Sequence, residues 1–129
     1  MSQTEQQARD TVANLVERFR SHFESYRSSG YRETEVRVEY IDPFFEALGW
    51  DVHNKLGYAE PYKDVVHEES LRSAAGIEAP DYTFRIGGTR KFFVEAKKPA
   101  VNVKADAGPA YQLRRYAWSG KLPLSILTD

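Results

Sequence analysis

The chain has 129 residues, no cysteine and a net charge of −1, with 41% hydrophobic and 13% aromatic residues. This length and composition predict one folded domain and exclude an intrinsically disordered chain, and the lack of cysteine excludes disulfides and thiolate zinc sites. No apolar run approaches the ~20 residues that span a bilayer, and the first ten residues lack a signal-peptide pattern. We therefore expect a soluble, cytoplasmic protein that has no membrane partner.

Charge is distributed unevenly along the chain. Residues 85–121 contain nine Lys and Arg against two acids, a net charge of +7, which leaves −8 for the remainder. A basic segment of this kind is expected on a surface that holds a polyanion such as nucleic acid. Solvated basic loops would give the same count.

The first predicted element is an amphipathic helix over residues 4–27. Apolar residues recur there at the spacing of one helix face, and Thr4 is a candidate N-terminal cap. The apolar face comprises Val12, Leu15, Val16, Phe19 and Phe23. Residues 28–30, Ser-Ser-Gly, are expected to end the helix. We expect this helix to serve packing and to take no part in catalysis.

A second helical stretch is predicted from Arg32 to about Leu48. Its buried face is expected to comprise Val38, Ile41, Phe44, Phe45 and Leu48. Pro43 interrupts the pattern, so either the helix kinks there or a new helix starts at Asp42-Pro43. Glu35 and Glu39 are one turn apart and share a face, as they would on an ordinary solvated surface.

Residues 50–79 are less regular. A strand is predicted within residues 63–68, with a contribution from residues 50–54 as an option, and a short helical turn is expected over 69–75. Three acids of this segment are interpreted as surface residues that serve solubility: Glu60, Glu68 and Glu69.

Residues 80–98 are the most distinctive stretch, and they predict a β-hairpin. An alternating run over residues 82–86 is followed by Gly87-Gly88 and a second run over residues 91–97. Asp81 stands at the start of the first strand, and Glu95 and Lys97 stand near the end of the second. In an antiparallel hairpin these two ends lie side by side, and the period of two puts Glu95 and Lys97 on one face.

Two carboxylates and an ammonium at one corner of a sheet favour a specific chemistry. Hard divalent cations such as Mg²⁺ prefer oxygen ligands and are usually held by one or two carboxylates. The lysine beside them can orient or activate a water, or stabilise developing charge on a phosphate. The alternative is a surface hairpin whose glutamate and lysine pair across solvent.

Three further elements are expected after the hairpin: a polar loop over residues 102–108, a helix over 110–119 and a buried strand over 122–128. On the helix, Gln112 and Tyr116 are four residues apart and share a face. A core tyrosine with an incidental glutamine would show the same spacing.

Four separated pieces of the chain carry a family resemblance. Pro80-Asp81, followed by Glu95-Ala96-Lys97, is similar to the PD-(D/E)XK signature of the restriction-endonuclease-like nucleases. The run from Glu35 to Asp51 resembles the opening of the nuclease domain in type I restriction-enzyme R subunits and in related type IIG and ISP enzymes. Gln112-x-x-x-Tyr116 resembles a motif that follows the catalytic core in type I R subunits and in RecB-like nucleases. Together the pieces cover residues 33–128.

This resemblance implies a fold and a domain organisation. The fold is α/β, with the αβββαβ core of those nucleases: a central mixed four-stranded sheet flanked by helices, plus one extra N-terminal helix. Residues 1–129 would form a single nuclease domain, with an N-terminal helical extension over 1–30 and the PD-(D/E)XK core over 31–129. The chain would be a fragment of a larger restriction enzyme, whose methyltransferase and target-recognition domains choose the cleavage site.

The chemistry that the resemblance implies is Mg²⁺-dependent hydrolysis of phosphodiester bonds in double-stranded DNA, with Mn²⁺ able to substitute. Asp81, Glu95 and the main-chain carbonyl of Ala96 would hold the metal. Glu35, or alternatively Glu39, would take a helical position beside the metal and would bind a second ion or its water shell.

The remaining roles also follow from the resemblance. Lys97 would position or activate the attacking water, Gln112 would steady Lys97 or the scissile phosphate, and Tyr116 would support Gln112. Contacts to DNA phosphates are expected from Lys98, Lys104, Arg114 and Arg115. Two alternatives stay open: a RecB-like repair or mobile-element nuclease, and a non-cleaving DNA-binding module with the nuclease fold.

Overall fold

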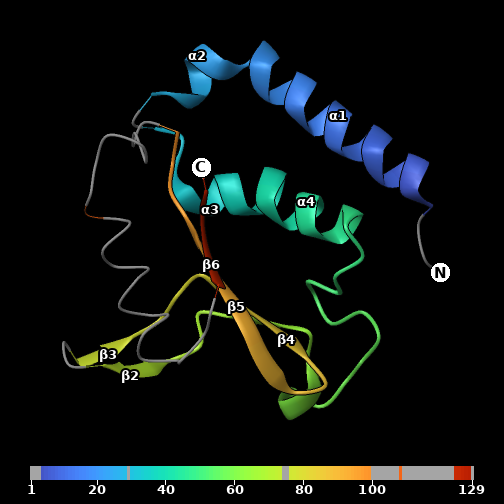
Figure 1. Cartoon of the computed structure of the whole chain (residues 1–129). Helices are drawn as coiled ribbons and strands as arrows, with labels where there is room; N and C mark the ends of the chain where they lie inside the picture. Colours follow the sequence, from blue (N-terminus) through green and yellow to red (C-terminus); the bar gives the residue numbers. More distant parts are fainter. Residues whose placement is uncertain (1–3, 29, 74–75, 100–107, 109–123, 129) are drawn as a thin grey trace.

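A four-stranded sheet forms the centre of the computed structural model, which describes residues 4–28, 30–73, 76–99, 108 and 124–128. Its strands lie in the order β1 (Val65–His67), β4 (Tyr82–Ile86), β5 (Thr89–Ala96) and β6 (Leu124–Thr128) (Figure 1). Neighbours among β1, β4 and β5 pair antiparallel, and β6 runs parallel to β5. The protein is therefore an α/β protein with a mixed sheet.

The predicted hairpin is confirmed as β4 and β5. Its turn residues, Gly87 and Gly88, have φ angles of 59° and 83°, in the left-handed region that glycine adopts without a steric penalty. The register shifts by one residue within the hairpin, because Arg85 pairs with Arg90 whereas Phe84 pairs with Phe92. Lys91 is thus the extra residue of a β-bulge.

The N-terminal helix begins as predicted and ends earlier than predicted. Thr4 caps α1 (Glu5–Ser21) in a reciprocal arrangement, in which the Gln7 N–H donates to the Thr4 hydroxyl and the Thr4 N–H donates to the Gln7 side chain. The helix breaks at His22 and resumes as the short α2 (Phe23–Tyr26). A single helix over residues 4–27 was therefore wrong. The break accompanies the stacking of Tyr26 on Tyr31, with ring centroids 4.2 Å apart.

The second helical stretch is divided into three pieces, α3 (Glu33–Val36), a π-helical turn η1 (Arg37–Ile41) and α4 (Asp42–Ala47). α4 begins at Asp42 and carries Pro43 in its first turn, but the backbone stays helical through Ile41, so α4 continues directly from η1 and Asp42 does not cap it. Pro43 has no N–H to offer to the carbonyl of Glu39 four residues earlier. The Arg18 guanidinium on α1 donates to that carbonyl.

The π-helical turn changes which residues are buried. Phe45 and Ile41 are buried as predicted, but Val38 is 63% exposed and Leu48 is 54% exposed. A π-helical turn contains more residues than an α-helical turn, so the apolar face shifts around the axis. The predicted buried positions of Val38 and Leu48, and of the borderline Phe44 at 37% exposure, were therefore wrong.

Residues 50–79 differ most from the prediction. The strand within residues 63–68 is present as β1, but residues 50–54 contain no strand, because the Asp51 carboxylate accepts hydrogen bonds from the N–H groups of Lys55 and Leu56 and closes a turn. A 3₁₀ turn covers Glu60–Tyr62. The helical turn expected over 69–75 is wrong. A second, two-stranded sheet stands there, with β2 (Leu71–Ser73) antiparallel to β3 (Gly76–Glu78).

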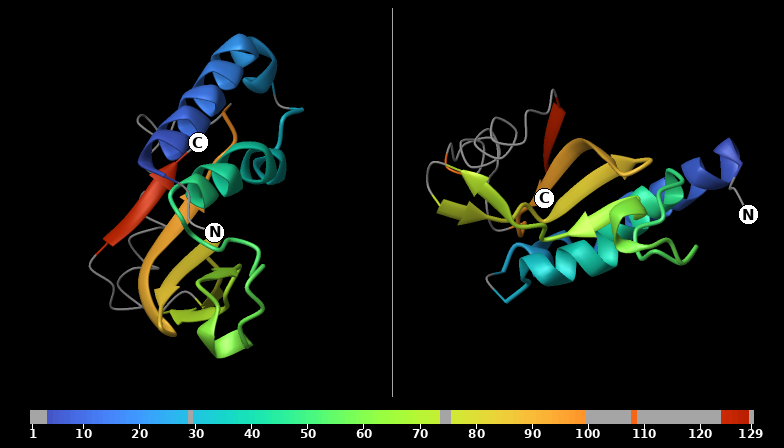
Figure 2. Two further views of the ribbon diagram at one scale, coloured as in Figure 1. Left: turned by 90° about the vertical axis from the view of Figure 1, so that its right-hand side faces the viewer. Right: turned by 90° about the horizontal axis from the view of Figure 1, so that it is seen from below.

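The core lies between the sheet and the helices. Figure 2 shows α1, α3 and α4 together on one face of the four-stranded sheet. Phe84 of β4 is fully buried, and its ring lies 4.6 Å from that of Phe45 and 4.9 Å from that of Trp50. This packing seats the helices over the hairpin and fixes the position of its two ends.

Two further predictions concern the C-terminal part. The strand predicted over residues 122–128 corresponds to β6, whereas the helix predicted over 110–119 and most of the loop over 102–108 lie outside the described residues. Among the described helices, none has both the length and the apolar character needed to cross a bilayer.

Candidate active site at the open end of the hairpin

Asp81 and Glu95 face each other at the open end of the β4–β5 hairpin. Tyr82 pairs with Val94 at the end of the ladder, so the next residues beyond this pair, Asp81 and Glu95, lie side by side, and a hydrogen bond joins their side chains. Directly opposite residues of an antiparallel pair project from the same face, with Cβ atoms about 4.5–5.5 Å apart. The bulge at Lys91 decides this pairing, since an unshifted register would place Asp81 opposite Val94.

The peptide backbone holds the Asp81 side chain in this position. The Ala96 N–H donates to Asp81 Oδ2 over 2.8 Å, so the end of β5 anchors the carboxylate directly. Ala96 itself has no exposed surface, and the Asp81 side chain is 17% exposed. Asp81 therefore has one anchored oxygen and one oxygen that faces other side chains.

Glu95 is a buried acid beside a second acid. The residue is only 4% exposed. Burial, a hydrogen bond with Asp81 and the negative charge of Asp81 raise the pKa of Glu95 to about 8, and the positive charge of Lys97 opposes this rise. Near neutral pH Glu95 therefore tends to keep its proton, and a bound cation would favour its ionised form.

Lys97 completes this corner of the sheet. Its main-chain N–H donates to the Thr128 carbonyl over 2.8 Å, which completes the last parallel pair of β5 with β6, Ala96 with Thr128. The side chains of Lys97 and Lys98 are both half-buried. The structure thus brings together three of the predicted site residues, Asp81, Glu95 and Lys97.

The structure does not bring the predicted helical glutamates to this corner. Glu35 accepts hydrogen bonds from the backbone and the guanidinium of Arg32 and so caps α3. Glu39 accepts a hydrogen bond from the Tyr31 hydroxyl over 2.6 Å, and burial together with this bond raises the pKa of Tyr31. Within the described ranges, no three Asp, Glu or His side chains are close enough to hold a metal ion together.

Sequence reasoning missed Arg37, which contacts the candidate site from the helical side. One guanidinium nitrogen lies 3.6 Å from Asp81 Oδ1, and another donates to the Asp81 main-chain carbonyl over 3.3 Å. The only trace in the sequence is an arginine between two valines, next to the buried Val36, which needs a partner once the segment packs.

A second polar pair was also missed. The Tyr82 hydroxyl donates to the Asp42 carboxylate, which is 6% exposed, and burial together with this bond raises the pKa of Tyr82. His53 lies 3.5 Å from the same carboxylate. This pair joins α4 to β4 behind the candidate site, and no spacing in the sequence marks it.

The structure corrects the reading of the basic segment. Arg85 is 9% exposed, and its guanidinium donates to the main-chain carbonyls of Lys63 and Glu60. Arg90 pairs with Glu69. Both arginines thus hold the fold together, so the count of positive charges overstates the basic surface. Glu69, interpreted as a surface acid, is instead the half-buried partner of Arg90, because its side chain is only 19% exposed.

Several predicted residues cannot be placed. Outside the described residues lie Lys104, Gln112, Arg114, Arg115 and Tyr116. The predictions for their roles are therefore untested.

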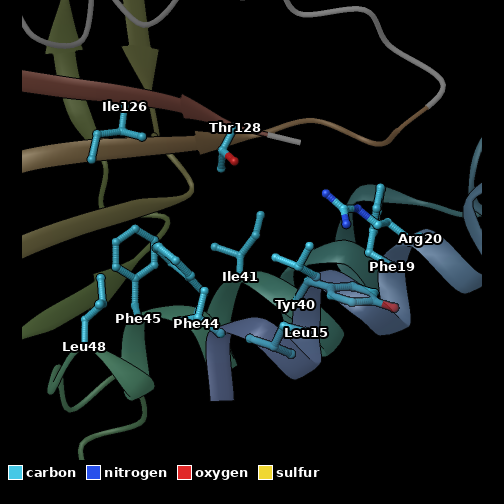
Figure 3. A pocket seen from close by; sticks show the side chains of 12 residues that line it. Leu15, Phe19, Arg20, Tyr40, Ile41, Phe44, Phe45, Leu48, Ile126 and Thr128 are labelled. Atoms are coloured by element: carbon cyan, nitrogen blue, oxygen red, sulfur yellow. The ribbon is translucent and has the colours of Figure 1, made fainter. Parts of the chain in front are cut away.

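A mostly apolar pocket of about 680 Å³ lies next to this corner, between α1, α4 and β6. In Figure 3, Leu15 and Phe19 of α1 face Ile41 and Phe44, with Ile126 of β6 on the far side. Its lining contains no acid, so the pocket supplies no carboxylate ligand for a cation.

Comparison with known proteins gives one informative similarity. The chain is 41% identical, over 123 residues, to the type II restriction enzyme and methyltransferase RM.Eco57I of Escherichia coli. The similarity covers 94% of this chain, and the chain spans 12% of the length of that curated relative. No family model and no solved structure matches the chain.

Proposed function

We propose that this chain is the Mg²⁺-dependent DNA endonuclease domain of a restriction-modification enzyme, with a PD-(D/E)XK site on a restriction-endonuclease-like core. The observation that carries the proposal is the position of Asp81 opposite Glu95, with the Lys97 ammonium close enough to oppose the rise in the pKa of Glu95. The similarity to a restriction enzyme and methyltransferase supports it.

The residues at this corner suit a divalent cation. Asp81 and Glu95 offer carboxylate oxygens on one face, and their mutual repulsion is the condition that a cation relieves. Mg²⁺ is commonly bound through one or two carboxylates, and it keeps several of its waters. Asp81, Glu95 and the carbonyl of Ala96 would hold the ion, and Mn²⁺ would substitute for Mg²⁺.

A bound ion would neutralise charge on the scissile phosphate and lower the pKa of an attacking water. Lys97 would orient that water and place a positive charge beside the phosphate. Burial of Glu95 keeps bulk water away from one side of the site, which strengthens these charge interactions. Gln112 would steady Lys97 or the phosphate, with Tyr116 supporting it.

Binding of double-stranded DNA would depend on phosphate contacts. Lys98, Lys104, Arg114 and Arg115 are the proposed contacts, and such contacts give affinity without sequence specificity. We propose that methyltransferase and target-recognition domains of the parent protein supply the specificity. The relative's description as both a restriction enzyme and a methyltransferase supports this arrangement.

The test is nicking of supercoiled plasmid DNA in Mg²⁺ or Mn²⁺, comparing the unsubstituted chain with Lys97→Ala. We expect at least a 100-fold slower rate for the variant, the usual minimum for loss of such a group. Lys55→Ala is the matched control, because Lys55 is an exposed lysine outside the hairpin, and it should leave the rate unchanged. Nicking that survives in Lys97→Ala would contradict the proposed site. DNA binding without nicking by any of the three proteins would favour a non-cleaving module.

A further inference from the structure

We propose that Arg37 is a positioning residue for Asp81 and that, through Asp81, it sets the affinity of the carboxylate pair for a divalent cation. This inference rests on the proposed function, since the orientation of Asp81 affects a cation only if the pair holds one. Arg37 would not itself touch the ion or the DNA.

The first support is that Arg37 contacts Asp81 at two points. Its guanidinium lies 3.6 Å from Oδ1 of the carboxylate and 3.3 Å from the main-chain carbonyl oxygen. The other carboxylate oxygen, Oδ2, accepts a hydrogen bond from the Ala96 N–H. Asp81 is thus held from the helical side by a planar cation and from the sheet side by a peptide group, which limits its rotation to the orientation that faces Glu95.

The second support is that Arg37 is itself firmly held. Its side chain is only 16% exposed, and the guanidinium lies over the Tyr82 ring, 4.8 Å from the centroid. It also lies 3.3 Å from a ring nitrogen of His67 and 3.5 Å from a Glu68 carboxylate oxygen. A surface cation attracted by chance to Asp81 would not also contact Tyr82, His67 and Glu68.

The third support is the backbone position of Arg37. It is the first residue of the π-helical turn, directly after Val36, which is 1% exposed. π-helical turns are rare and occur frequently at functional sites. This one begins at the residue whose side chain reaches Asp81, 44 positions later in the chain.

The test measures cation affinity without any cleavage. Mn²⁺ alone is titrated into the full 129-residue chain, and free Mn²⁺ is measured by electron paramagnetic resonance. We expect Arg37→Gln to raise the Kd for Mn²⁺ about tenfold, because residues that orient metal ligands typically contribute 10- to 100-fold in affinity. Arg9→Gln removes the same charge from an exposed pair with Glu5 and should leave the Kd unchanged.

Arg37→Lys separates orientation from charge and guards against a misfolded glutamine variant. Lysine keeps the charge but lacks the planar fork that reaches the carboxylate and the carbonyl together, so we expect an increase in Kd of about threefold. Unchanged or tighter Mn²⁺ binding by Arg37→Lys, or by a folded Arg37→Gln, would overturn the inference. Asp81→Asn tests the premise: if it binds Mn²⁺ as tightly as the unsubstituted chain, the proposed site fails, independently of the role of Arg37.

Discussion

The two ends of the β4–β5 hairpin differ in the partners of their charged side chains. At the turn end, the Arg85 guanidinium donates to two main-chain carbonyls and Arg90 pairs with Glu69, so each arginine has a hydrogen-bond or ion-pair partner. At the open end, two carboxyl groups face each other and one of them is almost fully buried. Burying like charges together costs stability. The turn end is thus arranged to stabilise the fold. At the open end Arg37 and Lys97 offset part of the cost of placing two acids together, and a bound cation would offset more of it.

The largest expected effect is at the open end. Glu95→Gln removes one of the two facing carboxyl groups while keeping the shape of the side chain. We expect nicking of plasmid DNA to fall at least 100-fold, and the free energy of unfolding in urea to stay the same or rise by about 1 kcal/mol. Glu17→Gln, an exposed acid on α1, serves as the control and should change neither quantity. Strong destabilisation by Glu95→Gln would show that Glu95 stabilises the fold.

The open end should also make stability depend on pH. Because the pKa of Glu95 is raised to about 8 in the folded state, the folded chain binds more protons than the unfolded chain between about pH 5 and 8. The contribution of Glu95 is therefore fully present at the acidic end of this range and is lost as the pH rises through 8. We expect urea midpoints to fall across this range, less so in Glu95→Gln, and Mn²⁺ to reduce the fall. A pH dependence identical in both proteins would contradict the raised pKa.

At the turn end, the expected effect is on stability alone. Arg85→Met keeps much of the apolar bulk but leaves the carbonyls of Lys63 and Glu60 without their donor. We expect a loss of about 3 kcal/mol in the free energy of unfolding, with nicking retained below the unfolding transition. Arg9→Met, at an exposed ion pair, should cost less than about 0.5 kcal/mol. Loss of nicking in folded Arg85→Met would show that the turn end also serves cleavage, and would contradict its purely stabilising role.

The smallest expected change in the free energy of unfolding concerns two glycines with similar backbone angles. Gly88 and Gly57 have φ angles of 83° and 76°, but a Cβ on Gly88 would lie 2.8 Å from the Pro61 carbonyl oxygen, whereas a Cβ on Gly57 would meet nothing within 4 Å. Gly57→Ala should cost about 1 kcal/mol from backbone strain alone. Gly88→Ala should cost roughly twice as much. Equal thermal unfolding midpoints for the two variants would show that the turn does not pack tightly on residues 60–62.

Parts of the fold were predictable because their determinants are close together in the sequence. Thr4 and Gln7 form the predicted start of α1 within one helical turn. The alternating residues and Gly87-Gly88 specify the hairpin within about fifteen positions. The failures have non-local causes: β2 and β3 pair where a helical turn was expected, and the π-helical turn exposes Val38.

The candidate site also has some features with local causes in the sequence and others with non-local causes. The sequence by itself determined that Asp81, Glu95 and Lys97 lie at one end of a hairpin, because a two-strand turn brings those positions together whatever surrounds them. Only the tertiary structure decided that a bulge at Lys91 sets Asp81 opposite Glu95, that Glu95 is buried, and that Arg37 holds Asp81. The contact between Arg37 and Asp81 depends on how the helices pack over the sheet, and no local pattern encodes a contact between residues so far apart.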